Sequence, residues 1–369
     1  MKKIIFYLPF AIDLNRFSAS QIRPAKILKS FKDSGYEVFE LTGNSCQRRI
    51  KYNQLRENLS NGVKYEFCYS ESSTMPSLIT DENHLPNSPL LDLGIFKLLK
   101  RNNISIGVFY RDIYWKFDSY KKNVGRLKYA YGTLFYNIDL WMYRKYVDVL
   151  FLPSLSMAEY LSPNLRCKVQ TLPPACDCGS DEIENESISV LKTSKNQKLS
   201  LIYVGGVTPP HYDLGPLFFA ASRNLQYTFK IICRKEEWDV AKKFYKLSSN
   251  VEIIHASGRS LEIEYKNSDL FLNLRNPDPY LNFSMPMKIF EAIQEEKPII
   301  TSNLFEIAKF VKENNIGWVI DGPNDLDVIL TSLENDSDIL KVTKENLRTT
   351  KAYNTWKMRV EKIQTLLAK

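Results

Sequence analysis

The run Phe283–Ile293 (FSMPMKIFEAI), followed by Lys297–Ser302 (KPIITS), predicts a loop, a helix and a strand in that order. Pro286 suits the first turn of a helix, where a missing N–H costs nothing. From Met287 onward the apolar residues recur at helical spacing, so one face of the helix is expected to be buried. The unit is typical of the second half of a strand–helix–strand repeat in an α/β protein.

The start of this helix also carries a set of polar groups. The backbone N–H groups of Ser284, Met285 and Met287 would point at the mouth of the loop, and a helix start attracts anions. Lys288 adds a point charge for phosphate, and Glu291, three residues on, can accept hydrogen bonds from a ribose diol. The run therefore predicts a nucleotide diphosphate site, with an ordinary amphipathic helix bearing a Lys–Glu pair as the alternative.

Strand-like and helix-like segments alternate on both sides of this unit, in two series. The expected strands of the first series are Lys3–Leu8, Tyr36–Thr42, Tyr65–Ser70, Ser105–Tyr110, Val147–Pro153 and Lys168–Leu172. Those of the second are Leu199–Val204, Phe229–Cys233, Val251–His255, Leu270–Leu274, Pro298–Thr301 and Trp318–Ile320. The alternation predicts an α/β protein with two doubly wound, Rossmann-like domains facing across a cleft.

A polar, charged stretch separates the two series and sets the expected domain boundaries. We expect an N-terminal domain over residues 1–178, a linker over 179–198 and a C-terminal nucleotide-binding domain over 199–350. Residues 351–369 are expected to form a C-terminal helix, with a return to the first domain as one option. The length of 369 residues agrees with two domains of ordinary size.

The composition excludes several classes of protein. No apolar run approaches the length that spans a bilayer, and the N-terminal run around Pro9 fits a buried strand better than a signal peptide. The six cysteines are scattered and the three histidines are not spaced for a metal, so we expect no metal site and no cofactor. A reducing cytoplasm fits this cysteine pattern best.

Candidate ligand-binding residues follow the strands of the second series. Gly205 and Gly206 end the first of these strands and allow a ligand to approach the backbone, although their spacing matches neither a dinucleotide fingerprint nor a phosphate-binding P-loop. Arg234 and Arg275 each follow a later strand and offer cations for phosphate. His211 lies just past the glycine pair and is expected to face the same cleft.

Candidate catalytic residues follow the strands of the first series. Glu71 and Asp112 are the acids placed at such strand ends, and either is a candidate general base or ligand of sugar hydroxyls. Arg111 precedes Asp112, and a salt bridge between the two, or a helix cap by Asp112, is the alternative interpretation. Arg23, in the first helix, offers another contact to an anion.

Residues 110–146 combine basic and aromatic side chains and contain few acids. This composition suits an anionic membrane surface, where aromatic rings lie at headgroup level. A helix packed on the sheet by its aromatics, with a solvated basic face, explains the pattern equally well. Binding to single-stranded nucleic acid is a weaker interpretation, and we expect no nucleic-acid partner.

Taken together, these residues resemble a GT-B glycosyltransferase of the family 4 type, as found in bacterial capsule and exopolysaccharide synthesis. The resemblance covers nearly the whole chain and is most specific over Ser284–Glu291 with Lys297-Pro298. It implies that Glu291 binds the ribose and that the Ser284–Lys288 segment binds the diphosphate of the donor. It also implies transfer with retention of anomeric configuration, without a metal.

The chain departs from the family pattern at four places, one of which is the first loop, where Ala19 and Ser20 stand in place of the usual glycines. Phe283 occupies the position, eight residues before Glu291, where the family often has a first glutamate. Gly205-Gly206 replaces a usual Gly-Arg, so the phosphate-binding cation must come from elsewhere, with Arg234 and Lys288 as candidates. Arg111 stands where the family usually has a histidine, at the end of the expected strand Ser105–Tyr110.

We therefore expect a hexosyltransferase-type enzyme that moves a sugar from a nucleotide donor, UDP-linked, to a lipid-linked or oligosaccharide acceptor in polysaccharide biosynthesis. It is expected in the cytoplasm, with peripheral attachment to the inner face of the membrane as an option. Two alternatives are a nucleotide-sugar epimerase and a non-catalytic, nucleotide-sugar-binding subunit of a polysaccharide assembly complex.

Overall fold

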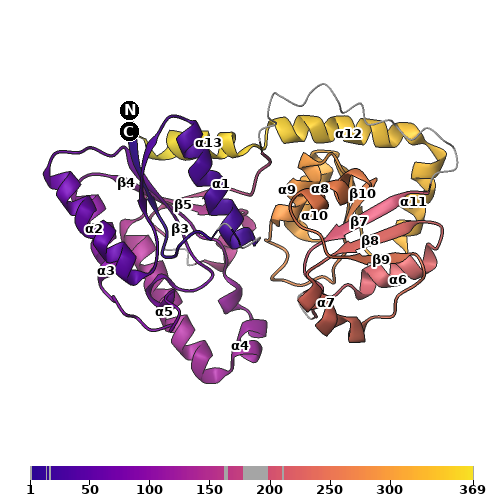
Figure 1. The fold of residues 1–369 in the computed structure, drawn as a ribbon, viewed down its shortest axis with the longest axis horizontal. Coiled ribbons are helices and arrows are strands. Elements are labelled where there is room, and N and C mark those ends of the chain that lie inside the picture. The colour runs from indigo at the N-terminus through magenta and orange to yellow at the C-terminus, as the bar shows by residue number, and fades with distance from the viewer. Residues whose placement is uncertain are drawn as a thin grey trace. The chain divides into compact units, whose positions relative to one another are not determined.

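The chain folds into two compact units, shown in the computed structural model of Figure 1. The structure describes residues 2–13, 15, 18–161, 165–177, 198–209 and 212–368. One unit combines Met1–Pro174 with Trp356–Lys369, and the other is Ala175–Thr355. Most of the expected linker, residues 179–197, lies outside the described residues.

The first unit is built on a parallel six-stranded sheet with the order β2-β1-β3-β4-β5-β6. The strands are β1 (Lys3–Tyr7), β2 (Glu37–Leu41), β3 (Phe67–Glu71), β4 (Ser105–Phe109), β5 (Val149–Leu152) and β6 (Lys168–Thr171). The helices are α1 (Ala19–Asp33), α2 (Ser45–Ser60), α3 (Leu91–Arg101), α4 (Asp118–Val124), α5 (Arg126–Tyr146) and α13 (Trp356–Leu367). Every residue of β3 and β4 is buried, as expected for a parallel sheet covered on both faces.

The second unit repeats this plan with the strand order β12-β11-β10-β7-β8-β9, again all parallel. Its strands are β7 (Ser200–Val204), β8 (Thr228–Ile232), β9 (Val251–Ile254), β10 (Leu270–Asn273), β11 (Ile299–Ser302) and β12 (Gly317–Ile320). Its helices are α6 (Gly215–Arg223), α7 (Lys235–Ala241), α8 (Arg259–Lys266), α9 (Met287–Gln294), α10 (Phe305–Glu313), α11 (Asp325–Asn335) and α12 (Ser337–Ala352). The two sheets confirm the predicted pair of doubly wound α/β folds.

Helix α9 begins where the sequence predicted. Pro286 is its N-cap residue, with extended backbone (φ −68°, ψ 145°), and Met287 is its first helical residue. Ile289, Phe290 and Ile293 are fully buried in one of the two cores of the second unit. The polar side of α9, which carries Lys288 and Glu291, is thereby kept at the surface.

Each sheet has one point at which the direction of winding reverses. In the first sheet the chain moves from β1 outward to β2 and then returns to β3 on the other side of β1. In the second sheet it moves from β7 to β8 and β9, and then returns to β10 beside β7. Helices on opposite faces separate at such a point, and ligands of doubly wound sheets bind there, beyond the carboxyl ends of the strands.

The C-terminal helix α13 belongs to the first unit, where it packs against α1, β3 and β4 (Figure 1). Arg359 donates hydrogen bonds of 3.0 Å to the carbonyl oxygens of Pro173 and Pro174. Leu367 lies over Gly107, where a Cβ atom would come within 2.6 Å of the Leu367 Cδ1 atom. Gly107 therefore leaves the space that Leu367 occupies.

No helix within the described ranges is both long and apolar enough to cross a membrane.

Candidate functional site

The reversal point of the second sheet brings together the glycine pair and a tyrosine of β7. The hydroxyl of Tyr203, a fully buried residue, donates a 2.6 Å hydrogen bond to the carbonyl oxygen of Gly206. A Cβ atom on Gly205 would lie 2.8 Å from the Tyr203 hydroxyl, and one on Gly206 would lie 2.9 Å from the ring of Tyr212. A side chain at either glycine would thus require the neighbouring tyrosine to shift.

Arg275 reaches the same point from the other side, because it follows β10. Its backbone N–H donates to Ser302 Oγ at 2.9 Å, which fixes the backbone at the end of the strand. Its Nη2 atom lies 3.3 Å from the Tyr203 hydroxyl, and its guanidinium carbon lies 4.8 Å from the centre of the Tyr212 ring. Burial raises the pKa of Tyr203 to about 12, so its hydroxyl stays protonated at neutral pH. The guanidinium of Arg275 is therefore positioned beside the Gly205-Gly206 loop.

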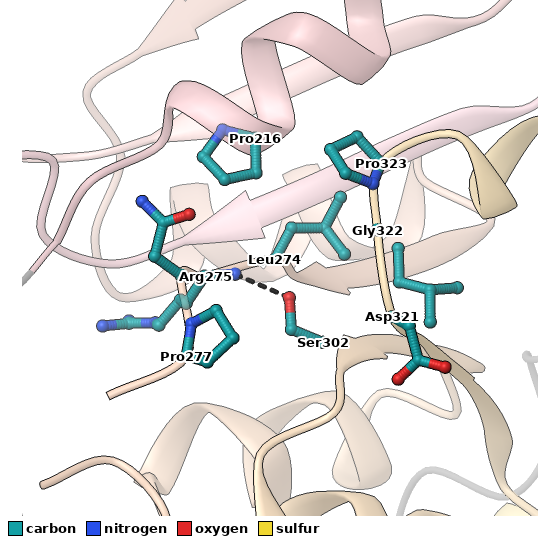
Figure 2. Close-up of a pocket in the computed structure, with 10 residues that line it drawn as sticks. Pro216, Leu274, Arg275, Pro277, Ser302, Asp321, Gly322 and Pro323 are labelled. Atoms are coloured by element: carbon teal, nitrogen blue, oxygen red, sulfur yellow. Dashed lines mark hydrogen bonds between the residues drawn. The ribbon is translucent and has the colours of Figure 1, made fainter. Parts of the chain in front are cut away.

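A small pocket lies next to this network, at the carboxyl ends of β10, β11 and β12 (Figure 2). Figure 2 shows the guanidinium of Arg275 directed away from the carboxylate of Asp321. The pocket wall is formed by residues that end or follow the three strands and by the start of α6: Pro216, Leu274, Arg275, Asn276, Pro277, Ser302, Ile320, Asp321, Gly322 and Pro323. The hollow thus belongs to the edge of the sheet at which a ligand is expected.

Helix α9 presents its first turn at the same edge, because it follows β10 in a parallel sheet. Lys288 Nζ contacts both carboxylate oxygens of Glu291, at 2.9 and 2.6 Å, and both side chains are partly exposed. Ser284 Oγ donates to the carbonyl oxygen of Leu281 at 2.8 Å. Met285 packs against the core, and Met287 opens the helix. The first-turn N–H groups of Met287 and Lys288 have no acceptor within the helix.

Arg234 and His211 are the other two residues of this unit that the sequence predicted as ligand-binding residues. Arg234 is the N-cap residue of α7, where its side chain is largely exposed and its Nη2 atom lies 3.3 Å from Glu237 Oε1. It therefore sits beyond β8, on the far side of β7 from Arg275. His211 lies outside the described residues.

In the first unit, Glu71 is the centre of a buried ion cluster at the reversal point. Its carboxylate pairs with Nη1 of Arg23, accepts a 2.9 Å hydrogen bond from the Tyr69 hydroxyl, and lies 3.1 Å from Nη2 of Arg111. The guanidinium of Arg23 stacks on the ring of Phe109, with its carbon 3.4 Å from the ring centre. Glu71 is fully buried and bonded on both oxygens, so two guanidinium groups share its single carboxylate as a partner.

Arg111 and Asp112 follow β4, next to this cluster. The backbone N–H of Arg111 donates to Ser72 Oγ at 3.0 Å, and burial lowers the pKa of its guanidinium, while the charge of Glu71 opposes that shift. Asp112 is partly exposed, and its Oδ1 atom accepts a 2.9 Å hydrogen bond from the backbone N–H of Tyr114. Of the two acids predicted in this unit, Asp112 is therefore the one that solvent reaches.

Sequence reasoning missed two residues that organise these sites, Tyr203 and Tyr69. Each lies on a strand next to a predicted site residue, and its role depends on a hydroxyl that reaches an arginine from another element. A buried tyrosine two or three residues before a glycine or acid at a strand end is the signal that was available. Within the described residues, no group of three or more His, Cys, Asp or Glu side chains is placed to hold a metal ion.

Comparisons by sequence found no relative: no protein-family model and no curated protein matches the chain. Solved structures do match it over its whole length. Sucrose-phosphate synthase from Thermosynechococcus elongatus is similar with a TM-score of 0.66 and 11% identity, over 99% of this chain and 98% of that one. WaaG, a glycosyltransferase involved in lipopolysaccharide biosynthesis, is similar with a TM-score of 0.56 and 16% identity, over 100% and 99%.

A third similar structure is HepE from Anabaena in complex with UDP and glucose, with a TM-score of 0.59 and 12% identity over 100% of this chain and 99% of that one. At such identities the likeness is one of fold. The two parallel six-stranded sheets of this chain match neighbours that have two Rossmann-like domains. The chain therefore has the GT-B fold, with two Rossmann-like domains, in which glycosyltransferases are built.

Proposed function

We propose that the protein is a glycosyltransferase that binds a UDP-linked sugar on its second unit. The observation that carries the proposal is the network of Arg275, Tyr203 and Gly206 at the reversal point of the second sheet. A guanidinium held beside a glycine loop is suited to diphosphate oxygens, because it donates several charge-assisted hydrogen bonds from a fixed position. HepE, which shares the fold, has been crystallised with UDP and with UDP-glucose.

In this proposal the donor spans the edge of the second sheet. The first turn of α9 and Lys288 contact the diphosphate, together with the partial positive charge of the helix start. Glu291 accepts hydrogen bonds from the ribose hydroxyls through oxygen lone pairs that Lys288 leaves open. Arg275 thus supplies the cation that a Gly-Arg sequence would otherwise bring to the position of Gly206.

The proposed reaction transfers the glycosyl group to a hydroxyl of a lipid-linked or oligosaccharide acceptor bound by the first unit. The acceptor oxygen forms a bond to the anomeric carbon, the bond from that carbon to the diphosphate breaks, and UDP leaves. Arg275, Lys288 and the α9 N–H groups stabilise the charge that develops on the leaving diphosphate. That set of cations supports a reaction without a metal, and the resemblance to retaining transferases supports retention.

We assign different roles to the two acids of the first unit. Asp112 is the carboxylate available to bind sugar hydroxyls or accept a proton. Glu71 is a positioning residue that holds Arg111 and Arg23 at the end of β3 and β4. Arg111, whose side chain is partly exposed, is then presented towards the bound acceptor.

The donor site is tested by isothermal titration of the full chain with UDP and with uridine. Arg275→Gln is expected to weaken UDP binding by about tenfold to a hundredfold, since one charged contact to phosphate is lost, and to leave uridine binding unchanged. Arg234→Gln, a matched arginine of the same unit, is the control and is expected to change neither. If the unaltered protein binds no UDP, the proposed donor is wrong.

Turnover without an acceptor separates the transferase from the other two functions. An epimerase converts free UDP-glucose to another UDP-sugar without releasing UDP, whereas a transferase releases UDP in proportion to acceptor. A protein that binds UDP-glucose and releases no UDP with any membrane-extract acceptor would be the non-catalytic subunit. Separation of the nucleotide products by anion-exchange chromatography gives the answer in each case.

A further inference from the structure

Helix α5 carries apolar residues on two opposite sides. One side is buried in the first unit and consists of Gly132, Phe135, Tyr136, Asp139, Leu140, Met142, Tyr143 and Tyr146. The other side carries an outer stripe, defined as Leu127, Tyr131, Leu134, Ile138 and Trp141. Leu127 is 88% exposed, Tyr131 39%, Leu134 57% and Trp141 46%. Ile138 is partly buried. Their spacing of four and three residues places them on one side of the helix.

Near the middle of α5, the outer stripe adjoins the segment that contains His84 and Leu85. The hydroxyl of Tyr131 donates a 2.9 Å hydrogen bond to the carbonyl oxygen of His84. The next residue, Leu85, is exposed and adds to the apolar surface near the stripe. Scattered apolar residues on a surface need no explanation, but a continuous row of them marks an interaction site.

Basic side chains are also exposed on α4 and α5. The exposed basic residues of α4 and α5 are Lys121, Lys122, Arg126, Lys128 and Lys145. Lys145 Nζ lies 5.3 Å from the ring centre of Trp141, so the stripe and a cation are in direct contact. Asp118 is the one exposed acid on these two helices, both of which are described in full, since Asp139 is buried.

This combination distinguishes between possible occupants. A second copy of the chain would place one basic surface against another, which is unfavourable. An anionic bilayer instead accepts both parts of the surface, because lipid phosphates attract the lysines while aromatic and leucine side chains enter the headgroup region. A bilayer also requires no matching shape.

We propose that the outer stripe of α5 binds the surface of an anionic lipid bilayer, with Leu127, Leu134 and Trp141 inserted among the headgroups. The lysines and arginines of α4 and α5 contact the lipid phosphates. This goes beyond the proposed transfer reaction, because membrane binding is measured without any sugar substrate. A failure of the transferase assignment would leave the proposal standing, and the reverse also holds.

The test is co-flotation of the full chain with vesicles of phosphatidylcholine alone or mixed with phosphatidylglycerol. The unaltered protein is expected to float with the mixed vesicles at low salt and to be released at high salt. The variant L127E/L134E is expected to bind at least about tenfold more weakly, because two inserted leucines are lost. The matched control V328E/V342E alters two exposed valines of the second unit and is expected to bind normally.

Two further measurements separate charge from insertion. K121Q/K122Q/K128Q is expected to weaken binding by about fivefold for each charge removed. Tryptophan emission is expected to shift to shorter wavelength with mixed vesicles, and the W141F variant is expected to lose that shift. Thermal unfolding of each variant is expected to match that of the unaltered protein, since every altered residue is exposed.

Three results would overturn the proposal. The first is equal binding of L127E/L134E and V328E/V342E to the mixed vesicles. The second is equal binding of the unaltered protein to neutral and anionic vesicles. The third is a dimer in solution that L127E/L134E dissociates, with no vesicle binding, because the stripe would then be a contact between copies.

Discussion

At the residue scale, the hydroxyl of Tyr203 determines where Arg275 holds its guanidinium. The hydroxyl has one proton, which it donates to Gly206, and its oxygen accepts from Arg275. A phenylalanine at position 203 would fill the same space and remove both hydrogen bonds. The residue is thus suited to position the arginine without contacting a ligand itself.

Tyr203→Phe is therefore expected to raise the dissociation constant for UDP by about threefold to tenfold, the effect of losing one hydrogen bond to a charged group. Uridine binding is expected to stay the same, because the diphosphate is the part that Arg275 contacts. Titration calorimetry with both ligands measures the two constants. Equal losses for UDP and uridine would show that Tyr203 supports the whole site rather than Arg275.

A second prediction compares the two acids of the first unit. Glu71→Gln leaves the guanidinium groups of Arg23 and Arg111 without their shared counter-charge, and is expected to destabilise the unit by about 3–5 kcal/mol. Asp112→Asn keeps the hydrogen bond to Tyr114 and is expected to cost less than about 1 kcal/mol while lowering kcat. Thermal unfolding and the transfer rate are measured for both. Full activity of Asp112→Asn would remove it from the catalytic group.

The glutamate cluster also shows where reasoning from sequence ends. Both Glu71 and Arg23 were found as candidates from their positions after a strand and in a helix start. Their pairing joins residues that are 48 positions apart in the chain, and no local pattern encodes which acid meets which arginine. The sequence predicted Glu71 as a candidate general base, whereas the structure shows it as a buried counter-ion. Which of the two it is depends on how the chain packs around it.

At the scale of elements, the sequence predicted the strands and the start of α9, because apolar periodicity and helix-breaking residues such as proline act on the local backbone. Pro286 and the apolar spacing after it placed the start of α9 correctly, and all twelve expected strands are present. Helix α1 begins at Ala19, after its N-cap residue Ser18. Its first turn has little apolar periodicity and is exposed or partly buried, so its start is harder to locate from the sequence.

Helix α5 is joined to the loop after β3 by a buried carboxylate. Asp139 accepts hydrogen bonds from the backbone N–H (2.9 Å) and the hydroxyl of Ser77, the first residue of the short helix Ser77–Ile79. Burial raises the pKa of Asp139 to about 7, with the charge of Asp92 adding to the shift and that of Arg48 opposing it. The native state therefore holds this proton more tightly than the unfolded chain does.

It follows that the free energy of unfolding of the first unit should fall as pH rises from about 4 to about 7, and level off above that. Asp139→Asn carries no titrating group and is expected to flatten this part of the profile. Urea unfolding of both proteins at several pH values provides the measurement. A profile that is unchanged by the substitution would assign the pH dependence to other groups.

At the scale of the whole molecule, the first unit depends on a helix from the far end of the chain. Leu367 is buried and lies over Gly107 of β4, while Arg359 holds the carbonyl groups of Pro173 and Pro174. The sequence indicated a C-terminal helix, with a return to the first domain as one option, but not the residues that it contacts, because the fit between Leu367 and a glycine is visible only in three dimensions.

Leu367→Ala is expected to destabilise the first unit by about 2–5 kcal/mol, the usual cost of emptying a buried leucine site. Amide hydrogen exchange should accelerate in β4 and α1 and stay unchanged in β7 to β12, which belong to the other unit. Val342→Ala, at an exposed position on α12, is the control and is expected to change neither set. Equal acceleration in both units would mean that they unfold together.

The return of α13 to the first unit also has a consequence for biosynthesis. A ribosome delivers the six strands of the first sheet early, but the helix that covers Gly107 follows only after the second unit has been made. During that interval the nascent first unit exposes the apolar surface of β3 and β4 that α13 later shields. The second unit is contiguous in the chain and can close first, whereas the first unit can complete its packing only once α13 has been made.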